Sequence, residues 1–461
     1  MTTYPDTKYK AVTEHNIRRE PVWEKMSPQT QRTIEVVSKV LPFRTNRYVI
    51  QELIDWNNLP EDPMFQLVFP QKGMLSPSQF TAVRDSLRRE DHPDILGELV
   101  SNVRASLNPH PAGQLTHNVP TLNGKKLHGL QHKYRETVLF FPSQGQTCHA
   151  YCTYCFRWAQ FVGMPEIKFE ESGTDNLVAY LTENKSVTDV LITGGDPMVM
   201  KTSVLRKYIE PLLQPSLEHI QNIRIGTKAL AYWPQRFVTD QDADDCLKLF
   251  EEVTEKGKHL AIMGHYSHPC ELDPPIARQA VARILGTGAQ IRMQAPIIRH
   301  VNDDPWAWYR LWTEGTKLGM IPYYMFVERD TGAKGYFEVP LARCHEIFHG
   351  ALQKVSGLAR TVRGPSMSTF HGKVRVNGTA TIREEKVFVL ELIQARDSSH
   401  TGQPFFARFD EQASWLDDLR PAFGEDRFFF ETDRADTDIV TKLPPSRESI
   451  PAEHLISISQ N

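Results

Sequence analysis

The sequence predicts an α/β fold whose parallel strands form an open, partial (β/α)6 barrel. From residue 137 onward, short apolar runs alternate with amphipathic helical patterns, and polar groups gather where the runs end. The six runs lie at residues 137–141, 187–195, 220–228, 258–266, 289–297 and 320–329. Repetition of strand and helix implies a parallel sheet covered by helices, and six strands are too few for a complete eight-stranded barrel. We therefore expect the active site at the carboxyl ends of the strands.

The helices between these runs carry start and stop signals. Gly257 follows the amphipathic stretch 239–256 and is expected to end that helix. Asp273 is expected to cap the next helix, with Pro274 in its first turn and Gly286 after its end.

We divide the chain of 461 residues into three parts, because its length exceeds that of one ordinary domain. Residues 1–115 are polar and Pro-interrupted, and they predict an N-terminal helical accessory region. Residues 116–400 hold the barrel, followed by two further predicted strands at 373–378 and 386–393. Residues 401–461 form a C-terminal extension whose acidic end we expect to be loosely structured.

Composition excludes several classes of partner. A net charge of −3 gives no excess of Lys and Arg for nucleic acid or an acidic membrane surface, so we expect a small-molecule substrate. The start of the sequence lacks a signal peptide pattern and no apolar run could span a bilayer, which predicts a cytoplasmic protein. Three of the six cysteines lie between residues 148 and 155, which favours a metal site in a reducing compartment over disulfides.

The cysteine motif directly follows the first predicted strand. Cys148, Cys152 and Cys155 offer three thiolates without a fourth cysteine nearby in the sequence. An electron-carrying ferredoxin fills its cluster with four thiolates. Three thiolates leave one iron of a [4Fe–4S] cluster open to grip the amino and carboxylate groups of a cofactor, as in radical S-adenosylmethionine (SAM) enzymes. The alternative is a structural zinc site, for which the spacing of His149 does not match. Tyr154 is expected to pack on the adenine of SAM, the alternative being an ordinary loop aromatic.

Polar groups at the later strand ends are candidates for binding the same cofactor. Gly194, Gly195 and Asp196 form a turn after the second strand, where glycine allows the backbone to approach the cofactor's ammonium group. Three further strand-end residues are expected to contact SAM, although each could instead be a packing residue: Thr227, His265 and Gln294.

The order of these motifs resembles that of the lysine 2,3-aminomutase family of radical SAM enzymes. The resemblance covers roughly residues 60–395 and rests on the segments DPMFQLVFP, HKY, CHAYCTYCFR, LITGGDP, IRIGTK, HYSHPCE, VNDDP, IPYYMF and the GK at 372–373. It implies a radical SAM partial barrel that binds pyridoxal 5′-phosphate in addition to the [4Fe–4S] cluster and SAM. The implied reaction is an isomerisation in which the α-amino group of an amino acid moves to its β-carbon.

The resemblance also assigns the pyridoxal 5′-phosphate site. Lys373 matches the lysine that binds the cofactor's aldehyde, although the family's glycine-rich run before it is replaced here by SMSTFHG, and a surface lysine is the alternative. Lys133 and Tyr134 match the segment that holds the phosphate and stacks a tyrosine on the ring. A second phosphate arginine is replaced by Thr137, and Arg135 is close enough in sequence to compensate.

The substrate residues follow from the same resemblance. Arg157 matches the arginine that grips the α-carboxylate, which a guanidinium can bind with two parallel hydrogen bonds. Two aspartates hold the distal ammonium in lysine-specific members, and Arg329 and Ser366 occupy those positions here. A buried arginine would repel an ammonium, so we expect an acidic or polar side chain, glutamate first, instead of lysine. A one-residue slip would instead place Glu328 or Asp330 in the pocket.

Three functions stay open on this basis. The first is a 2,3-aminomutase acting on a free, small-molecule amino acid. The second is a protein-lysine-modifying relative resembling the aminomutase that acts on elongation factor P, although the long extensions argue against it. The third is a radical SAM enzyme without pyridoxal 5′-phosphate. Each requires an electron donor such as flavodoxin or ferredoxin, and each is compatible with a homo-oligomer. No zinc site is expected, because the cysteines that build one in some relatives are absent.

Overall fold

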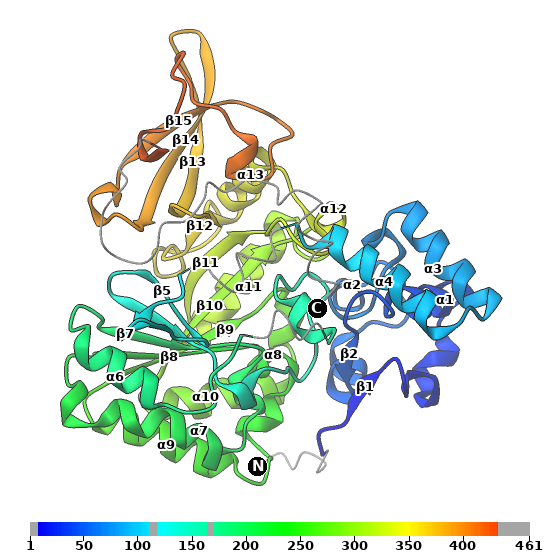
Figure 1. The fold of residues 1–461 in the computed structure, drawn as a ribbon, viewed down its shortest axis with the longest axis horizontal. Coiled ribbons are helices and arrows are strands. Elements are labelled where there is room, and N and C mark those ends of the chain that lie inside the picture. Colours follow the sequence, from blue (N-terminus) through cyan, green and yellow to red (C-terminus); the bar gives the residue numbers. More distant parts are fainter. Residues whose placement is uncertain (1–7, 110–117, 164–168, 432–461) are drawn as a thin grey trace.

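A computed structural model describes residues 8–109, 118–163 and 169–431, so the end of the C-terminal extension lies outside the described residues. Its main feature is an eleven-stranded sheet, in which β6 to β12 run parallel and the strands at both edges are antiparallel (Figure 1). The sheet order is β15 (Pro404–Arg408), β14 (Glu385–Ala395), β13 (Gly372–Ile382), β12 (Arg363–Ser368), β11 (Ile321–Val327), β10 (Gln290–Ile297), β9 (His259–His265), β8 (Asn222–Thr227), β7 (Asp189–Ile192), β6 (Thr137–Phe140) and β5 (Leu130–Tyr134).

The predicted α/β class is confirmed, and each of the six predicted runs contains one parallel strand, β6 to β11. The seventh parallel strand, β12, was not predicted, because RGPSMS lacks the apolar alternation of the others. The helices that follow the parallel strands are α6 (Asp175–Glu183), α7 (Thr202–Ile209), α8 (Ala229–Tyr232), α9 (Ala243–Glu255), α10 (Pro275–Gly286), α11 (Pro305–Lys317), α12 (Lys334–Phe337) and α13 (Leu341–Leu352).

The two faces of the parallel sheet differ in polarity because side chains alternate along each strand. In β8, Ile223 and Ile225 are fully buried, whereas Arg224 on the other face is half-buried. Met293 of β10 lies on the apolar face, and a side chain on Gly315 of α11 would collide with it. The helices therefore cover the apolar face, and the opposite face carries the polar side chains.

Of three helix-end signals in the sequence, the structure agrees with one and differs from two. Gly257 adopts a left-handed φ of 77° just after α9, as predicted. The predicted cap at Asp273 is wrong, because α10 begins at Pro275 with Pro274 as its cap residue, and Asp273 ends the preceding 3-10 turn. Gly286 is the last residue of α10 and does not follow it.

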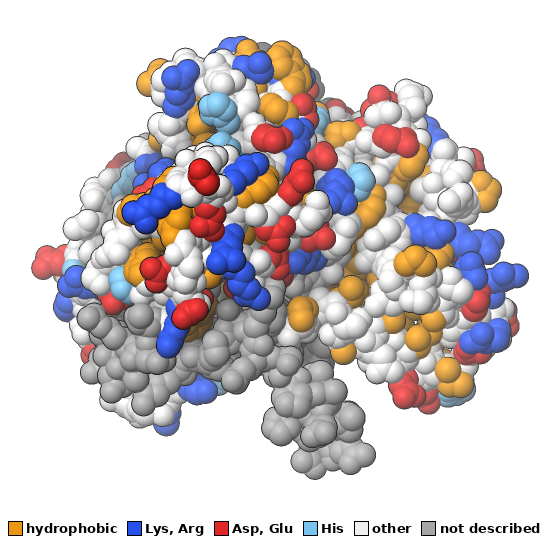
Figure 2. All heavy atoms as spheres, turned by 90° about the horizontal axis from the view of Figure 1, so that it is seen from above, with side chains coloured by type: hydrophobic (Ala, Val, Ile, Leu, Met, Phe, Trp, Pro, Cys, Tyr) orange, Lys and Arg blue, Asp and Glu red, His pale blue; other side chains and the backbone are white. Residues whose placement is uncertain are grey.

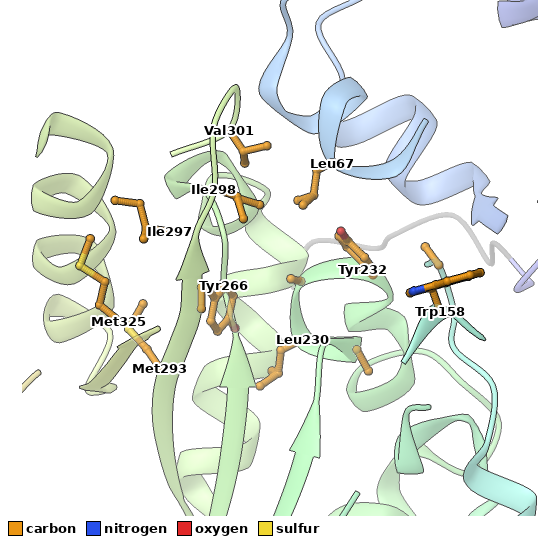
Figure 3. Close-up of a cluster of buried hydrophobic side chains, with 14 of the residues drawn as sticks. Leu67, Trp158, Leu230, Tyr232, Tyr266, Met293, Ile297, Ile298, Val301 and Met325 are labelled. Atoms are coloured by element: carbon orange, nitrogen blue, oxygen red, sulfur yellow. The ribbon is translucent and has the colours of Figure 1, made fainter. Parts of the chain in front are cut away.

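The N-terminal region contains the helices α1 (Pro28–Val37), α2 (Pro63–Val68), α3 (Pro77–Arg89) and α4 (Pro93–Leu107), with two short strands, β1 (Ala11–Thr13) and β2 (Arg44–Asn46). Ser27 and Ser76 cap α1 and α3 through their hydroxyl groups, each followed by proline in the first turn. One continuous apolar core joins this region to the sheet, and Leu67 of α2 lies between Ile298 and Tyr232 (Figure 3).

The two strands predicted after the barrel form the antiparallel hairpin of β13 and β14, which projects from the sheet (Figure 1). Its turn places Arg383 and Glu384 at positive φ, as a tight hairpin requires. Figure 2 views the molecule from above the view of Figure 1, and acidic and basic side chains are interspersed on the face that it shows. Within the described ranges, no helix is long and apolar enough to cross a membrane.

Candidate active site

The cysteine loop, residues 147–155, follows β6. Cys148, Cys152 and Cys155 are free, half-buried thiols, and burial is the main reason why their pKa values are raised, that of Cys155 to about 12. Iron binding would displace these protons, as metal binding to thiols generally does. Each thiolate of a [4Fe–4S] cluster binds its own iron, so three separate thiols are compatible with such a cluster.

The side chain of His149, within this loop, packs against aromatic rings. Its ring stacks on Trp233 and meets the edge of Tyr9. Burial lowers the pKa of His149 to about 3, so the ring is neutral. Its Nδ1 atom is buried and has no hydrogen-bond partner among the described residues.

The N-terminal region braces the cysteine loop. The side-chain amide of Asn46 donates to the carbonyl of His149 at 3.2 Å, and the amide of Thr153 donates to the carbonyl of Leu67 at 2.9 Å. The hydroxyl of Thr153 donates to Leu67 as well, at 3.0 Å. The region predicted as accessory thus holds the loop in place, and no local sequence signal could have indicated these contacts.

The turn after β7 packs against the segment that leads into the first cysteine. A side chain on Gly195 would collide with the backbone of Thr147, and one on Gly194 would collide with the amide of Gln146. The amide of Asp196 donates to the carbonyl of Thr147 at 2.6 Å. These glycines thus allow a close contact within the protein's own chain, and their approach to the cofactor stays a prediction.

The carboxylate of Asp196 joins this turn to the end of β8. It accepts hydrogen bonds from the hydroxyl of Thr227 at 2.7 Å and from the amides of Lys228 at 2.8 Å and Met198 at 2.9 Å. Burial raises the pKa of Asp196 to about 6, although these hydrogen bonds oppose the rise. Asp196 and Thr227 therefore serve the internal structure, and their contact with SAM stays a prediction.

His265 and Gln294 form a pair on the polar face of the sheet. They lie side by side in the register of β9 and β10, with 2.9 Å between the Nε2 atoms. Burial, followed by the charge of Lys228, lowers the pKa of His265 to about 4. His265 ends β9, whereas β10 continues three residues past Gln294, which was expected at the strand end. The two side chains can together offer neutral hydrogen-bonding groups to a ligand.

A buried ion pair that was not predicted from the sequence lies near the cysteine loop. The Nζ of Lys228 is 2.6 Å from the carboxylate of Glu271, which is fully buried. The same Nζ lies 4.5 Å from the ring centroid of Tyr232, whose hydroxyl is 3.5 Å from the Sγ of Cys152. The pair therefore fixes the ring whose hydroxyl contacts Cys152.

Tyr154 is held by the end of β9. Its hydroxyl lies 3.4 Å from the hydroxyl of Ser267, and its ring meets that of Phe337 edge to face. Tyr154 is thus fixed beside the loop, and its predicted packing on adenine stays a prediction.

Arg157 lies beside the cysteine loop with a hydrogen-bonding group unused. Its Nη2 donates to the side chains of Gln146, at 3.0 Å, and Gln160, and its guanidinium lies 4.5 Å from the ring centroid of Phe141. The buried Nε finds no hydrogen-bond partner among the described residues. Burial lowers the pKa of Arg157 to about 10, which leaves it charged at neutral pH. An unused donor on a buried cation fits a carboxylate ligand.

Lys373 is half-buried, and its amine lies among aromatic rings. It pairs with Ser368 in the sheet, and its Nζ lies 4.4 Å from the ring centroid of Tyr324 and 5.8 Å from that of Tyr134. Burial lowers its pKa to about 8. The Nζ of Lys133 lies 5.3 Å from the ring centroid of the same Tyr134. The three predicted pyridoxal residues are therefore brought together, as an aldehyde and a ring would require.

The residues predicted to contact the substrate side chain are not buried as expected. Arg329 is exposed, with its guanidinium 5.1 Å from the ring centroid of Phe156, and Glu328 is the buried residue of the two, at 6% exposure. Strand β11 ends at Val327, so the alternation of faces no longer applies after it. Ser366 is buried, and its hydroxyl donates to the carbonyl of Met325 at 3.5 Å. The expectation of a buried arginine was wrong.

A loop of three thiols at the end of a parallel sheet, beside polar strand ends, defines an α/β enzyme of the radical SAM class. A protein of Aquifex aeolicus (strain VF5) named "Putative L-lysine 2,3-aminomutase" is 30% identical over 403 residues, which are 87% of this chain and 94% of that protein. The chain therefore belongs to the lysine 2,3-aminomutase family.

Other relatives match over about half of their length. The L-lysine 2,3-aminomutase of Bacillus subtilis (strain 168) is 28% identical, with 50% of this chain and 46% of the relative covered. The glutamate 2,3-aminomutase of Clostridioides difficile (strain 630) is 26% identical, with 46% of this chain and 47% of the relative covered. No family model matches the chain.

Solved structures give only distant matches. A radical SAM methyltransferase from Sphaerobacter thermophilus has a TM-score of 0.37 and 15% identity, covering 52% of this chain and 68% of that protein. SuiB of Streptococcus suis has a TM-score of 0.36 and 12% identity, covering 62% of this chain and 60% of that protein.

Proposed function

We propose that the protein is a radical SAM 2,3-aminomutase that uses pyridoxal 5′-phosphate and moves the α-amino group of a free amino acid to its β-carbon. The observation that carries this proposal is the position of the half-buried Lys373 amine against the rings of Tyr324 and Tyr134. A lysine with a lowered pKa is suited to bind an aldehyde, because its amine is more readily neutral.

The register of the sheet supports a shared site for the two organic cofactors. His265, Gln294 and Tyr324 lie side by side on β9, β10 and β11, so their side chains point to the same face. Lys373 contacts Tyr324. His265 is the last residue of β9, Gln294 lies three residues before the end of β10, and SAM is expected to bind at this pair. We propose that this face is the inside of the partial barrel.

The roles we propose for the protein's residues are binding and orientation. When bound, the cluster supplies the electron that cleaves SAM, and pyridoxal 5′-phosphate supplies a ring over which an unpaired electron can spread. Cys148, Cys152 and Cys155 would each hold one iron, and the amine of Lys373 would hold the cofactor's aldehyde carbon. Arg157 would orient the substrate by binding its α-carboxylate with the donor that has no partner.

We propose an acidic or polar side chain for the substrate, with glutamate the first candidate. Support comes from the charge of Arg329, which is close enough to Lys133 and Tyr134 to lower the pKa of both. Lysine is the second candidate, because the buried Glu328 offers a carboxyl group that could meet a distal ammonium. Burial raises the pKa of Glu328, whereas a cationic ligand would lower it again.

The experiment is anaerobic reconstitution followed by product analysis. The protein should bind about four irons per chain and, with dithionite, should convert SAM to 5′-deoxyadenosine. Cys152→Ala should abolish both, whereas Cys344→Ala, a buried cysteine on α13, should retain both. With added cofactor, a β-amino acid should form from glutamate or lysine. Formation of 5′-deoxyadenosine without a β-amino acid from any free amino acid would overturn the aminomutase assignment and retain the radical SAM class.

A further inference from the structure

A group of cations without acidic partners lies beside Lys373. Burial holds the pKa of Lys133 well below its ordinary value, and the charges of Arg396, Arg329 and Lys373 lower it further. In the described part of the chain, neither Lys133 nor Arg396 forms an ion pair with a carboxylate. Both side chains are half-buried. Charge of one sign that is partly withdrawn from water is costly, so this pair of cations calls for an anion.

Arg396 follows the last residue of β14, and hydrogen bonds hold its guanidinium group through the Nε and Nη2 atoms. Its Nη2 donates to the side chain of Asn118 at 2.5 Å, and its Nε donates to the carbonyl of Phe370 at 3.4 Å. Its guanidinium lies 4.5 Å from the ring centroid of Phe370. The Nη1 atom is buried and has no hydrogen-bond partner among the described residues. A guanidinium fixed in this way has a free donor to offer to a ligand.

Both cations contact the segment that leads into Lys373. The Nζ of Lys133 donates to the carbonyl of Thr369, and the backbone amide of Arg396 donates to the carbonyl of His371 at 2.9 Å. The hydroxyl of Thr369 in turn donates to the carbonyl of Gly372 at 3.1 Å. Two positive side chains therefore border the loop from which the lysine emerges.

We infer that Arg396, together with Lys133, binds the phosphate of pyridoxal 5′-phosphate. The inference rests on the proposed function and names the anion that this group of cations lacks. By the sequence resemblance, Thr137 replaces the family's second phosphate-binding arginine. Arg135, expected to compensate, is exposed at the turn between β5 and β6. Arg396 would supply the missing arginine. The replacement comes from β14 instead of β6, with an N–H group suited to a phosphate oxygen.

The test compares pyridoxal 5′-phosphate with pyridoxal, which has the same aldehyde and no phosphate. Each is titrated into cluster-reconstituted protein, and its dissociation constant is read from the absorbance of the lysine-bound form. Wild-type protein should prefer the phosphate form. Arg396→Gln should weaken binding of the phosphate form by about ten- to a hundredfold, the usual effect of a lost charged hydrogen bond, and leave pyridoxal binding unchanged. Arg408→Gln, an exposed arginine on β15, should retain the full preference.

Inorganic phosphate provides a measurement that needs no variant. It should compete with pyridoxal 5′-phosphate for wild-type protein and leave pyridoxal binding unaffected, and this comparison decides the matter if Arg396→Gln loses both aldehydes. An unchanged preference in Arg396→Gln, or phosphate that fails to compete, would overturn the inference alone. Binding of neither aldehyde to wild-type protein would overturn the proposed function and this inference with it.

Discussion

The side-chain amide of Asn46 donates one hydrogen bond to the carbonyl of His149, at 3.2 Å, and another to the carbonyl of Tyr232, at 2.9 Å. Its side-chain oxygen accepts a third from the amide of Val49 at 3.0 Å. Asn46 is fully buried. One side chain thus ties the N-terminal region to the cysteine loop and to the segment after β8.

Asn46→Ala should therefore loosen the cysteine loop. Two carbonyls would lose a donor in a buried place, at a cost of about 1–3 kcal/mol each in the free energy of unfolding. Iron content after reconstitution should fall below that of the wild type, and denaturant unfolding should show the lost stability. Asn57→Ala, an exposed asparagine of the same region, is the control and should change neither. Full iron content in Asn46→Ala would show that the loop does not need this brace.

Tyr232→Phe should lower the reduction potential of the cluster. The hydroxyl lies 3.5 Å from the Sγ of Cys152, and a hydrogen bond to a ligating sulfur stabilises the reduced, more negative cluster. The midpoint is measured by redox titration followed by electron paramagnetic resonance. Tyr180→Phe removes a hydroxyl that meets His132 and should leave the potential unchanged. Equal potentials in all three proteins would contradict the prediction.

Attachment of pyridoxal 5′-phosphate should depend on pH through Lys373. Burial lowers the pKa of its amine from 10.5 to about 8, and only the neutral amine attacks an aldehyde. The attachment rate should rise about tenfold per pH unit below pH 8 and level off above it, as followed by stopped-flow absorbance. Lys373→Arg should show no attachment. A rate that keeps rising to pH 10 would contradict the lowered pKa.

The same shift has a consequence for stability. Between about pH 8 and 10.5 the unfolded chain holds the Lys373 proton more tightly than the folded protein does. The contribution of Lys373 to the free energy of unfolding should therefore rise with pH across this window. Denaturant unfolding of wild type and Lys373→Met at several pH values isolates the effect, because the variant lacks the titrating group. Parallel curves for the two proteins would rule it out.

Arg157→Lys should impair substrate binding more than SAM cleavage. Lysine keeps the charge but loses the planar fork, so the KM for the amino acid should rise about ten- to a hundredfold. Slow formation of 5′-deoxyadenosine without substrate should persist. Arg206→Lys, which alters a surface pair with Glu252, serves as the matched control. A KM equal to that of the wild type would remove Arg157 from the substrate site.

Arg329→Asp should distinguish the two substrate candidates. Turnover of an acidic substrate should fall far more than 5′-deoxyadenosine formation without substrate, because the attracting charge becomes a repelling one. Product analysis with glutamate and lysine gives both rates. If wild-type protein prefers lysine, the Arg329 assignment is wrong, and Glu328→Gln should then be the variant that loses turnover.

Local patterns in the sequence predicted local features well. The apolar alternation that predicted β6 to β11 is a property of each strand, and the cysteine motif needs only eight consecutive residues. Gly195 was recognised as significant, but its close contact with the backbone of Thr147 could not be predicted because the two residues lie far apart in the sequence. The buried pair of Lys228 and Glu271 gave no signal, because each is an ordinary charged residue until folding brings the two together.

Burial near strand ends was the hardest property to predict. Glu328 and Arg329 are adjacent in the sequence, and which of them is buried depends on where β11 stops. Arg396 was overlooked because its partners, Asn118 and Phe370, belong to distant parts of the chain. A single sequence carries no record of such contacts.

The hydrogen bonds that hold the cysteine loop also bear on the order in which parts of the chain fold during synthesis. Side-chain hydrogen bonds between the described residues tie residues 147–155 to partners from Tyr9 to Ser267. Lys373 depends on strands that a ribosome makes later, since its register partner on β14 is Gln394. Because chains begin to fold from the N-terminus during synthesis, the thiols can be in place before the lysine has been translated.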